Sequence, residues 1–376
     1  MSNGKGRTIV EHLAAVQDPR VERTKFHSLI NIFVITLCGV LCGADDWVAM
    51  EEYGQSKQEW LGQFLDLSHG IPSHDTFGRV FAMLDPNEVQ ASFLDWVRSV
   101  AQLTHGEIVA IDGKQLCGSA DEAKGKDAIR MVSAWACANR LVLAQRKVDE
   151  KSNEITAIPT LLQLLDLHGC IVTIDAIGCQ REIAQTIVDQ GADYVLPLKE
   201  NQPALYAAVQ EYFADLAAPQ VRNVVYHKTT DKGHGRLEVR HHWLTDDVQW
   251  LAPVTGKAAW PGLAAIGMIR AERQTARGTT SHTRYYLTSL APDAQTFAAA
   301  ARSHWCIENQ VHWVLDVAFN EDHNRTRTGH ADENLAVIRH LALNLIKRDA
   351  SAKLGVKNRR LKAAWNDAYL AQILFG

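Results

Sequence analysis

Two stretches, EIVAIDGKQLCGS at residues 107–119 and GCIVTIDAIGCQ at residues 169–180, each contain a short apolar run that ends in an aspartate. Such runs predict buried β-strands. In α/β proteins, ligands bind beyond the carboxyl ends of the strands. We therefore expect Asp112 and Asp175 to lie side by side, each at the end of its strand. The alternative is that each aspartate only caps a turn or a helix.

The segments around these two strands predict a mixed α/β domain. Residues 131–148 are typical of two strands joined as a hairpin, and residues 154–169 are typical of a helix. Another helix and another strand follow before residue 200. From about residue 205 to residue 295, β-type segments replace the alternation of strands and helices. We expect a β-rich insertion there.

Residues 1–100 predict an all-helical N-terminal domain. Its apolar run LINIFVITLCGVLCGA, residues 29–44, is shorter than the roughly 20 residues that cross a bilayer, so we expect a buried helix and no membrane partner. The start of the chain shows no signal-peptide pattern, and the seven cysteines include no Cys-x-x-Cys pair. These features predict a cytoplasmic protein with reduced thiols.

A third carboxylate is expected from residues 302–322, RSHWCIENQVHWVLDVAFNED, which predict a helix. Polar residues four positions apart share one face of that helix: His304, Glu308, His312 and Asp316. We expect Trp305 and Trp313 to anchor the helix on the sheet. A zinc or di-iron centre within the helix is an alternative. A di-iron centre, however, needs two Glu-x-x-His copies on facing helices, and this helix has Glu-x-x-x-His without a second copy.

Three carboxylates that converge from distant parts of the chain predict a divalent-metal site for phosphoryl transfer. We expect Asp112, Asp175 and Glu308 to hold two Mg²⁺ ions, for which Mn²⁺ can substitute. Mg²⁺ binds few carboxylates and completes its coordination with phosphate oxygens. The rival third ligands are nearby acids: Asp316, Glu321 and Asp322.

The charge of the chain does not favour a protein that coats nucleic acid. The net charge is −4 and the isoelectric point is about 6.5, whereas phosphate binding draws on Lys and Arg. Residues 339–362 are an exception, because they are basic with Asp349 as their one acid. They form either a phosphate-binding strip or a solvated helix face.

Several blocks resemble, in order, those of insertion-sequence transposases of the ISAs type, also called H-repeat-associated proteins. They include IVAIDGKQLCGS, HGRLEVRHHWL, RYYLTSL and RSHWCIENQVHWVLDVAFNEDHNRTR. The resemblance covers nearly the whole chain. It implies a ribonuclease-H-like catalytic domain over residues 101–376, with the β-rich insertion and basic C-terminal helices, preceded by an N-terminal domain that binds DNA ends.

The family's DDE triad falls on Asp112, Asp175 and Glu308. Related transposases also carry a Tyr and an Arg one and two turns before the Glu, and a Lys two turns after it. Here His304 stands four residues before the Glu, Arg302 six before it and Leu315 seven after it. The fuller signature is not matched, so we carry over only the triad.

Basic, amide and aromatic residues elsewhere are candidate DNA contacts: Lys199, Asn201, Gln202, His234, Arg236, Arg240, Trp243, His304, Arg325, Arg327, Arg359 and Arg360. Residues near 200 could instead cap the end of a strand, and residues near 240 could pack across strands. Arg325 and Arg327 could instead pair with Glu321 and Asp322.

The sequence therefore predicts an insertion-sequence DNA transposase. We expect it to bind the terminal inverted repeats of its element, to hydrolyse a phosphodiester that frees a 3′-OH, and to join that 3′-OH to target DNA. Because two ends must be brought together, we expect a homodimer on double-stranded DNA. The alternatives are a ribonuclease-H-like nuclease without strand transfer and a decayed or domesticated DNA-binding protein.

Overall fold

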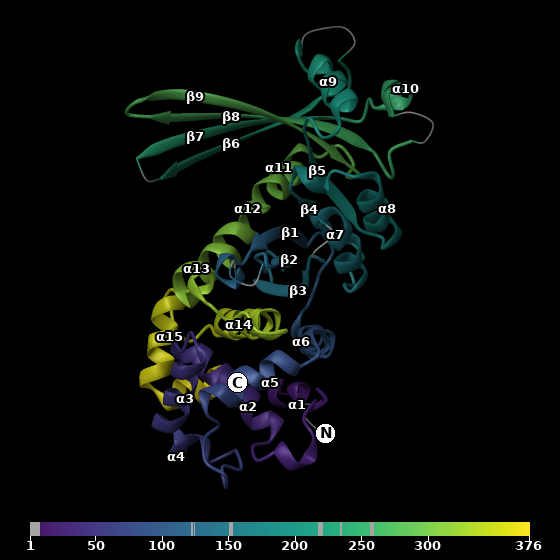
Figure 1. Cartoon of the computed structure of the whole chain (residues 1–376). Coiled ribbons are helices and arrows are strands. Elements are labelled where there is room, and N and C mark those ends of the chain that lie inside the picture. The colour runs from purple at the N-terminus through teal and green to yellow at the C-terminus, as the bar shows by residue number, and fades with distance from the viewer. Residues whose placement is uncertain are drawn as a thin grey trace, which may run out of the picture.

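The computed structural model describes residues 8–121, 123, 125–149, 153–216, 221–233, 235–255 and 259–376. Figure 1 shows three parts along one axis. Helices from both ends of the chain form one end, a sheet with flanking helices forms the middle, and long strands project sideways at the other end as an arm.

Within the described residues, the first hundred form helices and no strand. These helices are α1 (Ile9–Leu13), α2 (Leu29–Cys42), α3 (Trp47–Ser56), α4 (Gln58–Leu61), α5 (His74–Met83) and α6 (Pro86–Val100). Helix α2 begins after Ser28, whose side chain accepts the N–H of Asn31, and ends at Gly43 with φ of 104°. Almost all of α2 is buried, which confirms the prediction of a buried helix. No single helix in the described ranges is long and apolar enough to span a bilayer; α2 and α3 meet that criterion only as a pair bent by 96°.

Helix α14 joins the N-terminal helices to the sheet. The C-terminal helices are α14 (Ala331–Arg348), α15 (Val356–Trp365) and α16 (Asp367–Phe375). Helix α14 contacts α2, α5 and α6 on one side and the sheet on the other. The buried Asn334 Nδ2 donates to the carbonyl oxygens of Phe81 and Leu84, at 2.9 and 3.1 Å. Such bonds satisfy the last carbonyls of α5 and fix the angle between the two parts.

The basic C-terminal segment is partly interior. Arg360 is 5% exposed, and its Nε and Nη2 donate to the Val40 carbonyl at the end of α2, at 2.9 and 2.7 Å. Arg339 is also buried. The structure therefore uses both guanidinium groups inside the protein, and they are not available to a phosphate strip.

The nine strands form one sheet. They are β1 (Ile108–Gln115), β2 (Arg130–Ala136), β3 (Leu141–Lys147), β4 (Ile171–Ile174), β5 (Asp193–Leu198), β6 (Val225–Gly233), β7 (Arg236–Thr245), β8 (Ala265–Thr275) and β9 (Gly278–Thr288). Their order is β3-β2-β1-β4-β5-β9-β8-β7-β6. Strands β1, β4 and β5 are parallel, and all other neighbours are antiparallel. The predicted hairpin of residues 131–148 is confirmed as β2 and β3.

The expected β-rich insertion is present as β6 to β9, with two short helices, α9 (Pro203–Tyr212) and α10 (Ala252–Thr255). Its strands do not form a sheet of their own. Strand β9 pairs with β5, from Val195 opposite Thr288 to Leu198 opposite Tyr285. The arm in Figure 1 is thus a continuation of the core sheet.

Helices cover both faces of the core sheet. Helix α7 (Glu154–Gln163) packs on β2 and β3 and beside α8 (Arg181–Asp189). A long helical run covers the other face as α11 (Ala294–Ser303), α12 (Trp305–Ile307), a π-helical turn Glu308–His312 and α13 (Trp313–Phe319). The long helix predicted from the sequence is confirmed, but the π-helical turn was not expected.

Strand β3 is an edge strand that α14 closes. The Nδ2 of Asn344 donates to the Val142 carbonyl at 2.9 Å, and its Oδ1 accepts from the Val142 N–H at 2.8 Å. The Asn344 side chain is fully buried, so a single amide replaces the missing neighbouring strand at this point.

Replacing Asn344 with Ala should remove both partners of Val142 and lower the free energy of unfolding by about 2–4 kcal/mol. Urea unfolding of the full chain measures the change. The exposed Asn358→Ala is the control and should change it by less than about 0.5 kcal/mol. Equal stability of the two variants would mean that the edge of β3 does not depend on this amide.

Candidate active site

Asp112 and Asp175 lie level with each other on neighbouring parallel strands. Ile111 of β1 pairs with Ile174 of β4, and each aspartate is the next residue. Neighbouring strands are about 4.8 Å apart, so the two carboxylates face the same small volume. As predicted, Asp175 directly follows its strand, and it also caps the next turn, because its Oδ1 accepts from the Ile177 N–H at 3.1 Å.

The expectation that Asp112 ends its strand is wrong. Strand β1 continues to Gln115, because β2 pairs with it along this length, whereas the pairing with β4 stops at Ile111. Asp112 is therefore held by backbone hydrogen bonds on one side and open on the side of Asp175.

Glu308 reaches this edge from the helical run that crosses β1. It begins the π-helical turn, which adds a residue to one helical turn and rotates the rest of the helix relative to it. The Nδ1 atom of His312 then lies 3.3 Å from Asp112 Oδ2. Both Glu308 and His312 therefore approach the β1 aspartate, one from each end of the π-helical turn.

The three carboxylates have His312, beside Asp112, as a nearby basic group, but they have no Lys or Arg partner in the part of the chain that the structure describes. Burial, and then the charge of Asp112, raise the pKa of Asp175 above its ordinary value. Burial and Asp112 likewise raise the pKa of Glu308. A cation bound at this edge would remove that repulsion.

The rival acids gather around one lysine. Lys114 projects from β1 on the same face as Asp112 and forms ion pairs with Asp316 and with Glu321, the latter at 2.8 Å. Asp322 lies 3.8 Å from the same ammonium group. Glu321 is 2% exposed, and although burial opposes it, Lys114 and Arg339 hold the pKa of Glu321 below its ordinary value. Of the four candidate third ligands, Glu308 is therefore the one without an ion pair among the described residues.

The donor set suits a hard divalent ion that the substrate helps to coordinate. In the described part of the chain, no three His, Cys, Asp or Glu side chains surround one point closely enough to hold an ion by themselves. A structural zinc site needs about four protein ligands, so the alternative of a zinc centre within the helix is not supported. Mg²⁺ commonly takes one or two carboxylates, with phosphate oxygens completing its coordination. Unpaired carboxylates at one edge fit that mode of binding.

The tryptophans of this helix do not anchor it. Trp305 is 38% exposed and Trp313 is 61% exposed, so that expectation is wrong. Ile307, Val311 and Leu315 provide the buried face instead. The π-helical turn lies between the two tryptophans and changes which residues face the sheet.

Two of the residues predicted to contact DNA hold the turn after Asp175 in place. The Nδ2 of Asn201 donates to the Ala176 carbonyl at 2.7 Å, and the Nε2 of Gln202 donates to the Cys179 carbonyl at 3.1 Å. Lys199 is exposed and lines a cavity of about 660 Å³ together with Asp175. Of these three residues, Lys199 keeps its side chain free for a phosphate.

The residues predicted in the arm lie on two faces of its sheet. Arg236 and Arg240 share the face that looks toward α11 and α12, where both pair with Glu238. Trp243 lies on the opposite face, with its ring stacked on His241 at a centroid distance of 5.7 Å. His234 lies outside the described residues.

The remaining predicted contacts differ in how free they are. Burial lowers the pKa of His304, which lies near Asp112 and Asp175. Arg327 Nε donates to the Gly118 carbonyl at 3.0 Å, and Arg359 Nη1 donates to the carbonyls of Ile346 and Asp349, both at 2.7 Å. The two arginines are tied to the protein by these hydrogen bonds, whereas Arg325 is exposed. The four candidates therefore do not form one surface.

Sequence reasoning missed Arg284 and Lys114. Arg284 lies in β9 one residue before Tyr285, which pairs with Leu198, so it stands opposite Lys199. Its guanidinium is 5.7 Å from the centre of the Trp305 ring. Nothing in the sequence around Arg284 distinguished it from the other arginines of the insertion. Lys114 could have been found, because it lies two residues after Asp112 and so shares its face.

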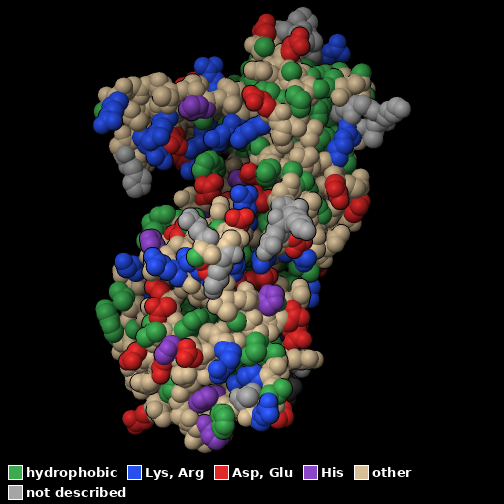
Figure 2. Space-filling model, viewed as in Figure 1, with side chains coloured by type: hydrophobic (Ala, Val, Ile, Leu, Met, Phe, Trp, Pro, Cys, Tyr) green, Lys and Arg blue, Asp and Glu red, His purple; other side chains and the backbone are tan. Residues whose placement is uncertain are grey.

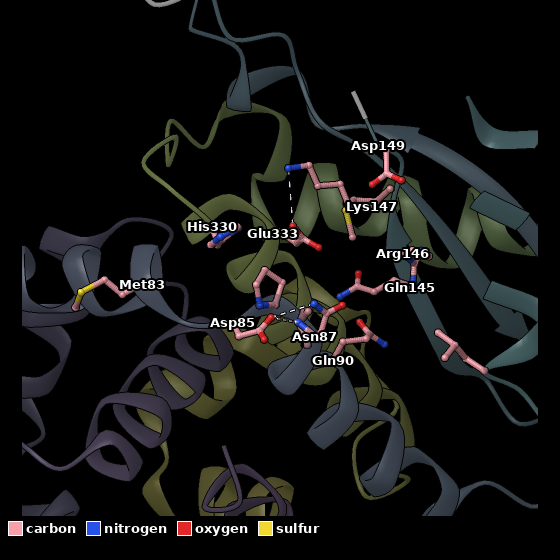
Figure 3. A pocket seen from close by; sticks show the side chains of 14 residues that line it. Met83, Asp85, Asn87, Gln90, Gln145, Arg146, Lys147, Asp149, His330 and Glu333 are labelled. Carbon is pink, nitrogen blue, oxygen red and sulfur yellow. Dashed lines mark hydrogen bonds and ion pairs between the residues drawn. The ribbon is translucent and has the colours of Figure 1, made fainter. Parts of the chain in front are cut away.

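Another cavity lies away from the three carboxylates. Figure 3 shows it between α6, β3 and the start of α14, with a volume of about 870 Å³. Its charged groups serve the structure: Asp85 caps α6 by accepting the Asn87 N–H at 2.9 Å, and Lys147 lies 3.9 Å from Glu333. It contains none of the three carboxylates.

The chain matches known proteins over nearly its whole length. The family model described as Transposase DDE domain matches residues 104–345, and one described as DDE_Tnp_1-associated matches residues 10–97. The chain belongs to the DDE transposase family. It is 39% identical to the "Putative transposase YncI" of Escherichia coli O157:H7 over 371 residues, which cover 98% of this chain and 94% of that protein.

Another relative is the "H repeat-associated putative transposase YhhI" of Escherichia coli (strain K12), 38% identical over 378 residues and 98% of each chain. The predicted resemblance to H-repeat-associated transposases is thereby confirmed. Among solved structures, a piggyBac transposase synaptic complex with hairpin DNA aligns with a TM-score of 0.43 and 9% identity, over 98% of this chain and 79% of that one. That likeness is too weak to carry an argument.

Charge repulsion among these carboxylates should lower the stability of the metal-free protein. A carboxyl whose pKa is higher in the folded protein binds protons more tightly there than in the unfolded chain, so its protonation stabilises the fold as pH falls. Asp175→Asn removes one charge and keeps an oxygen that can cap Ile177. In EDTA near pH 7 the variant should melt at a higher temperature than the wild type, and the difference should shrink as pH falls toward about 4, the ordinary pKa of an aspartate.

Thermal unfolding followed by circular dichroism measures this difference. Asp189→Asn, at the end of α8, is the control and should not reproduce it. A lower melting temperature for Asp175→Asn near pH 7 would contradict the idea that Asp175 is destabilised by its neighbours.

Proposed function

We propose that this transposase cuts its element ends and joins them to target DNA with Asp112, Asp175 and Glu308 as the metal-binding triad. The observation that carries the proposal is the pattern of ion pairs: Lys114 lies against the rival acids, whereas the triad carboxylates pair with no Lys or Arg among the described residues. The pairing of β1, β4 and β5 with helices on both faces supports a ribonuclease-H-like core.

Two divalent ions, Mg²⁺ or Mn²⁺, would supply activation of the attacking oxygen and stabilise charge on the leaving 3′ oxygen. The triad would hold them at the edge of the sheet, together with phosphate oxygens of the DNA. His312 orients the Asp112 carboxylate, and Asn201 and Gln202 fix the turn that carries Asp175. The protein contributes positions and charge, and forms no covalent bond with the DNA.

Loss of any triad carboxylate should abolish Mg²⁺-dependent cleavage of an end-containing duplex, by at least about 10²–10³-fold. The variants are Asp112→Asn, Asp175→Asn and Glu308→Gln, assayed for strand cleavage on a gel. DNA binding should persist, because the triad adds no positive charge. Joining of pre-cleaved ends then distinguishes a transposase from a nuclease without strand transfer.

Asp316→Asn is the matched control for Glu308→Gln, because Lys114 keeps Glu321 as a partner in that variant. It should retain cleavage. If Asp316→Asn loses cleavage and Glu308→Gln retains it, the third ligand has been assigned to the wrong residue.

We further propose that DNA follows the groove between the arm and the helical run. Figure 2 shows Lys and Arg side chains along the edge of the arm, where a hollow separates it from the body. This groove holds a cavity of about 470 Å³. Three exposed arginines line it and form no ion pair with any described residue: Arg273, Arg284 and Arg302. The groove continues past Arg284 to the cavity that holds Asp175.

Each of Arg273→Ala, Arg284→Ala and Arg302→Ala should weaken binding of duplex DNA and reduce the slope of log affinity against log salt by about 1. Fluorescence anisotropy of a labelled end, measured over a range of salt concentrations, gives that slope. Arg222→Ala, which removes an exposed arginine outside the groove, should leave the slope unchanged. Equal slopes for all four variants would place DNA on another surface.

Assembly on DNA would involve the helical N-terminal residues, which the associated family model matches and which would bind the element ends. Two copies would act together, because two ends must be joined in one complex.

A further inference from the structure

Strand β6 is an edge of the nine-strand sheet and runs along one side of the projecting arm (Figure 1). The opposite edge of the sheet, β3, is closed by the side chain of Asn344. Among the described residues, no side chain forms a hydrogen bond with the outer backbone groups of β6. An open edge of nine residues is a template on which another strand can pair.

Alternate residues of β6 present their backbone groups to the outside. Only two residues separate Gly233 at its end from Arg236 in β7, and these two residues pair. Such a short connection closes on a hydrogen-bonded pair, and hydrogen-bonded pairs recur at every second residue of an antiparallel ladder. The residues that turn their N–H and C=O groups away from β7 are therefore Tyr226, Lys228, Thr230 and Lys232.

Charge restricts how a second copy of β6 could pair with the first. Like charges that lie directly opposite each other destabilise a sheet. Centring an antiparallel pair on Lys228 or on Thr230 would set lysine against lysine. Centres nearer either end leave part of the strand unpaired, and one of them sets two Asp231 side chains together. Centred on Thr229, the pair includes all of Val225–Gly233, and no like charges oppose each other.

The same register gives unlike partners to groups that face like groups within one copy. Asp231 stands opposite Glu238 of β7, and Arg240 forms ion pairs with both carboxylates. His227 stands opposite His242, with ring centroids 6.0 Å apart. Between two copies, each His227 would instead face the partner's Asp231, which places an imidazole beside a carboxylate. The edge is therefore complementary to itself.

We propose that two copies of this chain pair antiparallel along β6, with a two-fold axis at Thr229. On the face away from the groove, the exposed ring of Tyr226 would lie opposite the partner's Lys232, which suits a cation–π contact. The two-fold axis of such a pair is perpendicular to the sheet, so the face that looks toward α11 and α12 is the same face in both copies. Both grooves would then open under one continuous sheet.

This inference rests on the proposed function for its purpose, because two DNA ends must be joined in one complex. The contact itself involves only the arm. It therefore stands or falls independently of the residues that bind metal.

Cysteine cross-linking of the full chain, read on a non-reducing gel after mild oxidation, tests the register. Thr229→Cys should give a disulfide-linked dimer, because residues opposed in a non-hydrogen-bonded pair have Cα atoms about 4.5 Å apart, within reach of a disulfide. Asp231→Cys is the matched control, since it faces the partner's His227, and alone it should link no more than the wild type with its seven free cysteines. A mixture of His227→Cys and Asp231→Cys should link.

Analytical ultracentrifugation of the full chain without DNA tests the pairing itself. The wild type should sediment as a dimer. Thr230→Pro should sediment as a monomer, because proline removes an outward N–H that the pairing with β7 does not use. Thr230→Val keeps that N–H and should remain a dimer. Circular dichroism confirms that both variants are folded.

The outcomes separate this inference from the proposed function. Absence of the Thr229→Cys cross-link, or a dimer that Thr230→Pro leaves intact, would overturn pairing through β6 and leave the triad untouched. Conversely, a β6 dimer whose Glu308→Gln variant cleaves DNA as the wild type does would overturn the proposed triad and leave the pairing in place.

Discussion

Parallel pairing of β1 with β4 is the constraint on which the rest of the site depends. Register along this pair puts Asp112 beside Asp175 in a partly buried place, where two negative charges raise the free energy of the fold. The ladder with β2 holds Asp112 in place, and the turn that Asp175 caps holds the second aspartate. A protein selected only for stability would not keep this arrangement, so its presence indicates that the charge is used.

Lys114 shows how that charge is preserved. It lies on the same strand face as Asp112, close enough in sequence to neutralise the site. Instead, Asp316 and the buried Glu321 occupy its ammonium group. Breaking the Lys114–Glu321 pair would leave a buried, uncompensated charge, which is strongly unfavourable, so the lysine stays where it is. Asp316 and Glu321, which the sequence offered as alternative third ligands, therefore keep the Lys114 ammonium group away from the triad.

The core strands, the buried helix α2 and the side-by-side placement of the two aspartates followed from apolar runs, whereas the extension of β1 beyond Asp112 depends on its pairing with β2. The assignment of Glu308 came from family resemblance, since four acids in this region have similar sequence patterns. The features that could not be predicted depend on contacts between distant segments. The exposure of Trp313 follows from the packing of Ile307 and Val311, and the burial of Arg360 follows from the carbonyl of Val40, 320 positions earlier. The approach of Glu154 to Gly113 likewise depends on the fold.

The order of strands also distributes charge along the edge. Strands β1, β4, β5 and β9 are consecutive in the sheet, about 4.8 Å apart. The first two carry Asp112 and Asp175, and the next two carry Lys199 and Arg284, which face each other just past the pairing of Leu198 with Tyr285. The two aspartates and the two basic residues therefore lie at separations that the spacing of the strands sets. The arm continues the hydrogen-bonded ladder of the core sheet. The groove beside the arm therefore keeps a fixed orientation relative to the carboxylates. A DNA backbone that runs from the groove to the carboxylates needs such a fixed orientation.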